Sequence, residues 1–152
     1  MSCSPPPGFH PFALKGFFYD TIGPLYARYS GGRLSLGFRC DERRCNLLGI
    51  CHGGMLMTLA DLQLGLGSNV DAGYEGFGPT VNLTGDFVRP ARLGEWVQGR
   101  SELVRRTRRL VFMSGALEAD GELVLRANAI VNLPRDPGGL AVADFLPPEH
   151  VG

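Results

Sequence analysis

The sequence lacks an excess of charge of either sign, and this absence excludes one broad class of partner. Fifteen lysine and arginine residues balance fifteen aspartate and glutamate residues in a chain of 152 residues. A chain without a net positive field has no general means of holding nucleic acid or an anionic membrane surface. We therefore expect no nucleic-acid partner, and any site for an anion must be local.

The sequence also lacks a long hydrophobic run, although 44% of its residues are hydrophobic. No apolar stretch is long enough to span a bilayer, and the amino-terminal residues lack the basic and apolar regions of a signal peptide. We expect no membrane partner and a cytoplasmic location. The length and the hydrophobic content are typical of a single domain with a substantial core.

Cysteines are few and irregularly spaced. Zinc sites usually contain two closely spaced cysteine pairs. Here Cys40, Cys45 and Cys51 are separated by gaps of four and five residues, Cys3 lies far away, and His52 adds only one further ligand. We predict no metal site and reduced thiols, with Cys51 packed beside the start of a helix.

Composition divides the chain into three stretches. Residues 1–8 form a Pro-rich leader, residues 9–133 hold the periodic hydrophobic segments, and residues 134–152 form a tail rich in Pro and Gly. We predict a flexible leader, one domain and an irregular carboxyl-terminal tail.

Hydrophobic periodicity predicts helices and strands in a definite order. Residues 10–29 carry apolar side chains near helical spacing, which predicts a helix broken near Gly23-Pro24. Residues 33–40 alternate as a half-buried strand does. Residues 53–69 are apolar nearly all round, which is typical of a helix enclosed by the rest of the protein.

Four further strand segments follow a Gly-rich loop, at residues 80–88, 95–104, 110–118 and 122–132. Short connections predict that they pair as an antiparallel meander in chain order, with Asp120-Gly121 as a hairpin turn. The predicted class is α+β, with a curved antiparallel sheet wrapped around a long central helix.

The start of that central helix has the features of an active site. Gly53 and Gly54 open the helix, where first-turn N–H groups lack an internal partner and can meet a developing negative charge. Asp61 lies about two turns further on among apolar neighbours. Burial of a carboxylate there is costly unless the group is paired or used.

Purely structural interpretations exist for the same residues. Asp61 would then be a hydrogen-bonded buried group, Asn46 a turn or cap residue, and His52 a satisfied histidine at a helix end. The joint spacing of these residues, rather than any one of them, favours chemistry.

The glycines and Thr80 have structural interpretations of the same kind. Gly53 and Gly54 would serve close packing, as we expect for Gly65 and Gly67 further along the helix. Thr80 is a good strand residue whatever its function.

The chain resembles the hotdog-fold acyl-CoA thioesterases, in the PaaI-like branch that includes the phenylacetate-pathway enzymes. The resemblance is carried by Asn46-x-x-Gly49-x-x-His52-Gly53-Gly54-x6-Asp61, and by Thr80-Val81-Asn82-Leu83 and Phe87-Val88-Arg89-Pro90-Ala91-Arg92-Leu93-Gly94-Glu95. It implies a hotdog fold that dimerises into a longer continuous sheet, often pairs again into a tetramer, and has active sites across the dimer interface.

The resemblance also implies residue roles. Asp61 is the catalytic carboxylate, as general base on water or as nucleophile on the thioester carbonyl. Gly53 supplies the N–H that polarises the thioester oxygen, and Gly54 lets the substrate approach closely. Asn46 orients the attacking water or the leaving sulfur, and His52 shapes the oxyanion loop.

Thr80 matches a hydroxyl that assists the water, at a position where some relatives carry Ser. Arginine binds phosphate in two places through its planar fork. The candidates for the CoA phosphates are Arg89, Arg92, Arg105, Arg106, Arg108 and Arg109, of which the last four could equally be a solvated turn. Aromatic candidates for the acyl pocket, which could equally be core residues, are Phe9, Phe12, Phe17, Phe18, Tyr74 and Phe77.

The function that follows from the resemblance is hydrolysis of an acyl-CoA to free acid and CoA, with an aromatic or medium-chain acyl group favoured. We expect no cofactor beyond the CoA of the substrate, and self-association as a homodimer or homotetramer. One alternative is a non-catalytic acyl-CoA-binding module, which would have no reason to keep Asp61 at the reacting centre. A hydratase or dehydratase fits less well, because those hotdog enzymes pair a histidine with a carboxylate in a differently spaced motif.

Overall fold

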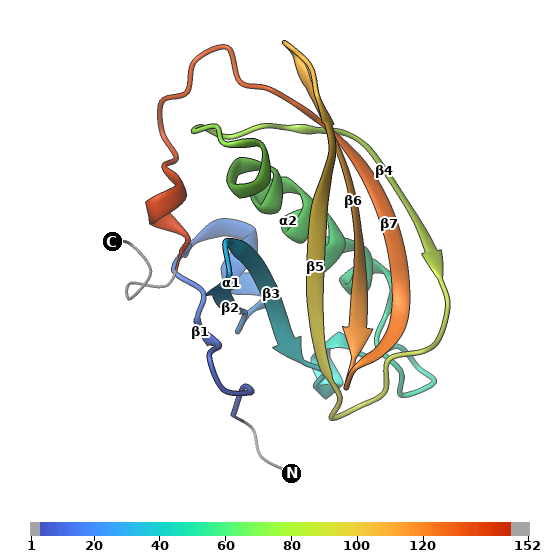
Figure 1. The fold of residues 1–152 in the computed structure, drawn as a ribbon. Coiled ribbons are helices and arrows are strands. Elements are labelled where there is room, and N and C mark those ends of the chain that lie inside the picture. Colours follow the sequence, from blue (N-terminus) through green and yellow to red (C-terminus); the bar gives the residue numbers. More distant parts are fainter. Residues whose placement is uncertain (1–3, 147–152) are drawn as a thin grey trace.

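The computed structural model describes residues 4–146, and one long helix lies across the concave side of a curved sheet (Figure 1). The seven strands are all antiparallel to their neighbours, in the order β1-β2-β3-β5-β6-β7-β4. The strands are β1 His10–Pro11, β2 Tyr26–Ser30, β3 Arg33–Arg39, β4 Thr80–Phe87, β5 Trp96–Arg106, β6 Leu110–Ala119 and β7 Glu122–Asn132. The helices are α1 Phe17–Ile22 and α2 Gly53–Ala72, with short 3-10 turns η1 Glu42–Arg44 and η2 Val142–Asp144. This arrangement confirms the predicted α+β class.

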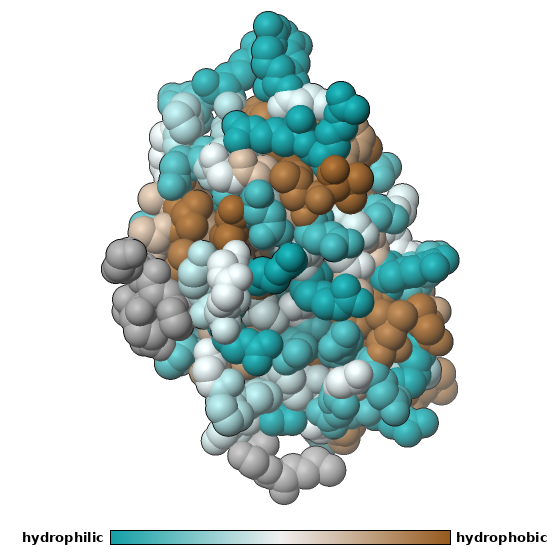
Figure 2. All heavy atoms as spheres, viewed as in Figure 1, coloured by the Kyte–Doolittle hydropathy of each residue, from teal (hydrophilic) through white to brown (hydrophobic). Residues whose placement is uncertain are grey.

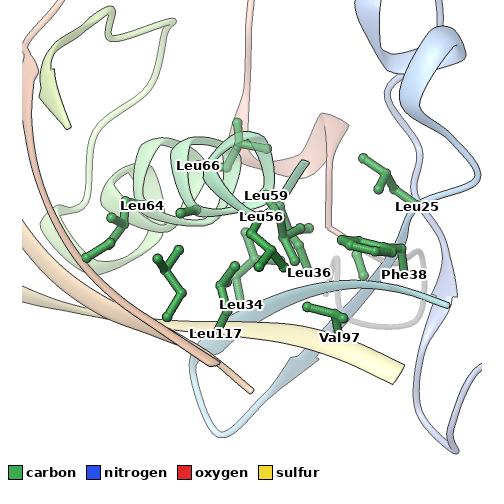
Figure 3. Packing of buried hydrophobic residues seen from close by; sticks show 14 of the residues in the cluster. Leu25, Leu34, Leu36, Phe38, Leu56, Leu59, Leu64, Leu66, Val97 and Leu117 are labelled. Atoms are coloured by element: carbon green, nitrogen blue, oxygen red, sulfur yellow. The ribbon is translucent and has the colours of Figure 1, made fainter. Parts of the chain in front are cut away.

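The central helix α2 supplies the middle of the core. Leu56, Leu59 and Leu64 are almost fully buried, and Figure 3 shows Leu56 and Leu59 beside Leu36, with Leu64 further along the helix. The helix ends three residues later than predicted, where Gly73 adopts the left-handed conformation with φ 67° and donates its N–H to the Asn69 carbonyl. None of the helices in residues 4–146 is both long and apolar enough to cross a membrane.

The helix predicted over residues 10–29 is wrong for most of its length. Only α1 is helical, and the chain is extended again from Tyr26, where β2 pairs with β3. Leu25 and Ala27 are buried while Tyr26 and Arg28 are partly exposed, which is the alternation of a strand. This alternation is hard to see in the sequence, because large aromatic residues occur at both the inward-facing and the outward-facing positions of the stretch.

The predicted meander holds for β5, β6 and β7, but β4 is not the neighbour of β5. Strand β4 pairs with β7 at the edge of the sheet, and β5 pairs with β3 instead. The link after β4 crosses the end of the β6–β7 hairpin, where the Val88 N–H donates to the Val124 carbonyl at 2.8 Å. A short connection therefore joins two strands that lie on different sides of the hairpin. The hairpin turn itself is as predicted, with positive φ at Asp120 and Gly121.

Both ends of the described chain pack on the domain. Phe145, beyond the last strand, is fully buried in the core, and the Gly76 N–H donates to the Leu140 carbonyl at 2.8 Å. At the other end, the Ser4 carbonyl accepts a hydrogen bond from Arg39 at 2.9 Å. Residues 1–3 and 147–152, parts of the predicted leader and tail, lie outside the described residues.

Candidate active site

The start of α2 is built around the side chain of His52. This residue is the N-cap of the helix in an extended conformation, and its Nδ1 accepts the N–H of Gly54 at 2.8 Å. A Cβ on Gly54 would lie 3.0 Å from the same Nδ1. Gly54 therefore makes room for the capping imidazole, whereas the N–H of Gly53 has no hydrogen-bond partner among residues 4–146. Gly53 is thus the donor that remains open to a ligand.

Asn46 holds the turn that leads to this helix start. Its Oδ1 accepts the N–H groups of Leu48 at 2.9 Å and Ile50 at 3.4 Å, and its own N–H donates to the Ile50 carbonyl at 2.8 Å. The turn is completed by Gly49 with φ 71°. Asn46 therefore acts as a turn residue here, while its side-chain NH2 forms no hydrogen bond within residues 4–146.

Arg44 ties the same segment to α1, and no feature of the sequence singled it out. Its guanidinium is buried and donates to the carbonyls of Ile22 at 2.7 Å and Pro24 at 3.0 Å, and to Asp41 at 2.8 Å. Burial lowers the pKa of Arg44, an effect that the Asp41 carboxylate opposes. The Arg44 carbonyl accepts the His52 N–H at 2.7 Å. Arg44 thus fixes the position of the capping histidine.

Asp61 lies further along α2, on the wall of a cavity of about 290 Å³. The predicted residue Thr80, at the start of β4, lines the same cavity, and so does Tyr19 from α1. Burial raises the pKa of Tyr19, and the nearby Asp61 carboxylate raises it further, so the phenol stays protonated. The complete lining consists of Tyr19, Asp61, Leu62, Gly65, Leu66, Asn69, Phe77, Gly78, Pro79 and Thr80.

The predicted site residues thus form two groups rather than one. Asn46, His52 and Gly53 lie together at the start of α2, and Asp61 and Thr80 share the cavity. Asp61 lies eight positions after Gly53, and a helix rises about 1.5 Å per residue, so the two lie roughly 12 Å apart along the axis. Within one chain, the free N–H of Gly53 and the carboxylate of Asp61 are therefore too far apart to contact the same small chemical group.

Among the aromatic candidates for an acyl pocket, only Phe77 lines the cavity with Asp61. Phe9 packs edge to face on Trp96 with ring centres 4.9 Å apart, and Phe12 is a buried core residue. The packing role predicted for Gly65 is wrong, because, apart from the adjacent backbone of its own helix, a Cβ there would meet nothing within 4 Å; Gly65 instead lines the cavity, where its place one helical turn after Asp61 could have indicated it. The sequence interpretation missed Tyr19, which reaches the cavity through tertiary packing alone.

Two of the predicted phosphate-binding arginines have structural partners. Arg89 lies 3.3 Å from the Glu95 carboxylate and 3.0 Å from that of Glu122, and thereby braces the link after β4. Arg106 donates to the Ala72 carbonyl at 2.5 Å, where a cation stabilises the carboxyl end of α2. These guanidiniums have fewer donors free for an anion.

The other predicted arginines are more open. The side chains of Arg92 and Arg108 are exposed and form no hydrogen bond or ion pair within residues 4–146. Arg108, Arg109 and Arg135 line a surface hollow of about 290 Å³ near the β5–β6 turn. This hollow is a local concentration of positive charge on a chain without net charge.

The thiols cluster beside the helix start. The Sγ atoms of Cys40 and Cys45 are 3.7 Å apart, and Cys51 is buried nearby in the loop that precedes His52. Burial raises the pKa of Cys45 to about 11, with a further contribution from the Cys40 thiol. No group of three His, Cys, Asp or Glu side chains in residues 4–146 is arranged to hold a metal ion.

A helix enclosed by a curved antiparallel sheet, with an open N–H at its start and a carboxylate in a cavity along it, defines an α+β protein of the hotdog class. The sequence profile of the Thioesterase superfamily matches residues 48–125. The chain belongs to this superfamily.

Known relatives agree with this assignment. The chain is 36% identical over 130 residues to a Pseudomonas aeruginosa protein named "Putative esterase PA0474", across 85% of this chain and 97% of that one. A structure of the phenylacetic acid degradation protein PaaI from Thermus thermophilus is 25% identical and matches with a TM-score of 0.68, covering 77% of this chain and 98% of that one. A thioesterase from Streptococcus pneumoniae, described as hypothetical and solved with coenzyme A, shares the fold with a TM-score of 0.62 at 19% identity, over 71% and 86% of the two chains. Superfamily and relatives together support thioester hydrolysis as the chemistry of this chain.

Proposed function

We propose that this chain hydrolyses acyl-CoA thioesters to a carboxylic acid and CoA. The observation that carries the proposal is Asp61, a partly buried carboxylate on the wall of a largely apolar cavity in a member of the Thioesterase superfamily. A protein that only binds an acyl group has no use for a carboxylate on an otherwise largely apolar wall. The CoA bound to the Streptococcus pneumoniae neighbour supports CoA as the thiol half of the substrate. We place this reaction in the cytoplasm, where thiols such as Cys40 remain reduced.

The reaction needs a nucleophile at the carbonyl carbon and a donor at the carbonyl oxygen. Asp61 either removes a proton from water as the water attacks, or attacks the carbonyl itself and is then released by water. The free N–H of Gly53 stabilises the negative charge that develops on the oxygen. The C–S bond then breaks and the CoA sulfur leaves with a proton. The hydroxyl of the water ends in the carboxylic acid, and its other hydrogen ends on the thiol.

The two halves of this machinery come from two copies of the chain. The separation of about 12 Å between Gly53 and Asp61 prevents one chain from supplying both to one thioester. Strand β4 is the last strand of the sheet and has no further strand partner among residues 4–146, and Val81, Phe87 and Val88 on and beside it are more than half exposed. An open apolar edge of this kind pairs readily with another strand. We propose that β4 of two copies meet in a homodimer, which can pair again into a tetramer.

The first experiment measures free thiol released from a panel of acyl-CoAs, with wild type and Asp61→Asn in parallel. The panel contains phenylacetyl, hydroxybenzoyl, short, medium and long acyl groups. We expect wild type to release thiol and Asp61→Asn to lose turnover while it still folds and binds CoA. Turnover by the variant would refute the role of Asp61. Binding of acyl-CoA without hydrolysis by wild type would instead identify a binding module.

A further inference from the structure

Gly65 occupies an unusual position in α2. A glycine inside a helix costs roughly 0.5–1 kcal/mol relative to alanine, so it usually has a packing reason. Gly67, two residues later, has one, because a Cβ there would overlap the Ser101 hydroxyl. Gly65 has none within the described chain: apart from the adjacent backbone of its own helix, a Cβ at this position would meet nothing within 4 Å. The space above Gly65 is therefore open.

That open space is part of the cavity that holds Asp61. Gly65 lies four residues after Asp61, on the same side of the helix, and both residues line the cavity together with Thr80. The other walls include the apolar side chains of Leu66 and Phe77. A side chain at position 65 would project into the room next to the proposed catalytic carboxylate.

We infer that Gly65 sets the size of the acyl group that the site accepts, by leaving this part of the cavity empty. The inference rests on the proposed function and deepens it. The cavity of about 290 Å³ lies just below the range of ligand pockets, which runs from about 300 to 1,000 Å³. Such a volume has room for one aromatic ring or a medium-length chain next to Asp61. The substrate class is therefore ring-sized or medium-chain acyl-CoA.

The test combines stability with substrate preference. Gly65→Ala should raise the thermal midpoint by about 2–4 °C, because it improves the helix without a clash. Gly67→Ala, the matched control, should lower the thermal midpoint through its overlap with Ser101. Gly65→Val should lower kcat/KM for phenylacetyl-CoA and octanoyl-CoA at least tenfold relative to acetyl-CoA, since a misfit of a methylene or two in a pocket costs about that much. An unchanged ratio between large and small substrates in Gly65→Val would overturn the inference.

A second measurement does not depend on turnover. Phenylacetamide and octanamide are neutral analogues of the acyl half, and their binding is followed through the backbone NMR signals of Gly65, Phe77 and Thr80. We expect binding to wild type that weakens at least tenfold in Gly65→Val. If wild type hydrolyses no acyl-CoA but binds the amides in this way, the proposed function fails and the acyl subsite stands. Failure of the amides to perturb these signals in wild type would overturn the subsite, whatever the outcome for hydrolysis.

Discussion

Gly53 and Gly54 are adjacent in the sequence, yet their surroundings give them different purposes. Gly54 avoids contact with the His52 imidazole and gives its N–H to that ring, while the Gly53 N–H is left free within the described chain. Sequence patterns identified the pair and the helix start correctly. They could not tell which glycine accommodates His52 and which keeps a free N–H, because this depends on the rotamer of His52. The same holds for Gly65 and Gly67, which differ only in what faces them.

Removal of the backbone N–H at position 53 tests the role of Gly53. Proline is tolerated at the first position of a helix and has no N–H, and the extended conformation of His52 is the one that a following proline requires. We expect Gly53→Pro to lower kcat by about 100- to 1,000-fold, as loss of one oxyanion donor does.

The control for this variant is Gly53→Ala. It keeps the N–H and introduces the same Cβ, which would lie 3.2 Å from the half-exposed Phe87 ring in both variants. Alanine should therefore retain most of the activity. Equal losses in the two variants would show that crowding against Phe87, and not the missing N–H, is responsible.

At the scale of elements, a buried side chain completes the joint between β3 and β5. The two strands pair only over residues 37–39 and 96–98. Beyond that point the Gln63 side chain accepts the Leu36 N–H at 2.8 Å, and donates to the Leu34 carbonyl at 2.9 Å and to Ser101 Oγ at 3.0 Å. An amide from the central helix thus replaces the hydrogen bonds that a neighbouring strand would provide.

Substitution of Gln63 should therefore be costly. Gln63→Leu fills a similar volume but leaves the buried Leu36 N–H and Leu34 carbonyl without partners, and each such group costs about 1–3 kcal/mol. We expect a loss of at least about 2 kcal/mol in the free energy of unfolding, measured by urea denaturation. Gln98→Leu makes the same chemical change at a partly exposed site on β5, where it removes one hydrogen bond, from the Trp96 indole N–H at 3.0 Å, and should cost only about 1 kcal/mol. Similar losses in both variants would contradict the proposed joint.

Elements were predictable from sequence to different degrees. The central helix and β5, β6 and β7 have strong periodicity and clear turns, such as Asp120-Gly121, and they lie where the pattern placed them. The segment at residues 10–29 was misjudged because its aromatic residues obscure the period. Gln63 carried no signal at all, since its position in an apolar helix does not reveal which strand hydrogen bonds are missing opposite it.

At the scale of the whole molecule, the pairing of strands far apart in sequence decides where the candidate site can be completed. Sequence alone put β4 beside β5, because a short link suggests adjacency. The link instead crosses the hairpin and leaves β4 at the edge of the sheet.

Hydrophobic residues also reach the surface in several places among hydrophilic ones (Figure 2), and the most exposed of the large ones are Phe17 and Leu47. Surfaces of this kind are suited to contacts between copies.

Mixing of inactive chains tests whether two copies share each site. Asp61→Asn and Gly53→Pro chains are unfolded together in equal amounts and refolded. A mixed dimer then has one site with both wild-type groups, so the mixture should recover about one quarter of the wild-type rate. Each variant refolded alone serves as the control and should stay inactive. No recovery in a mixture shown to contain mixed dimers would refute the shared site.

The burial of Phe145 has a consequence for how the protein is made. The last strand, β7, ends at Asn132, and the aromatic ring that enters the core lies further along the chain. During synthesis from the amino terminus, every strand of the sheet therefore exists before that ring does. A chain whose synthesis stopped after β7 would hold every strand but lack the ring that seals the core, and would expose apolar surface to which a chaperone can bind.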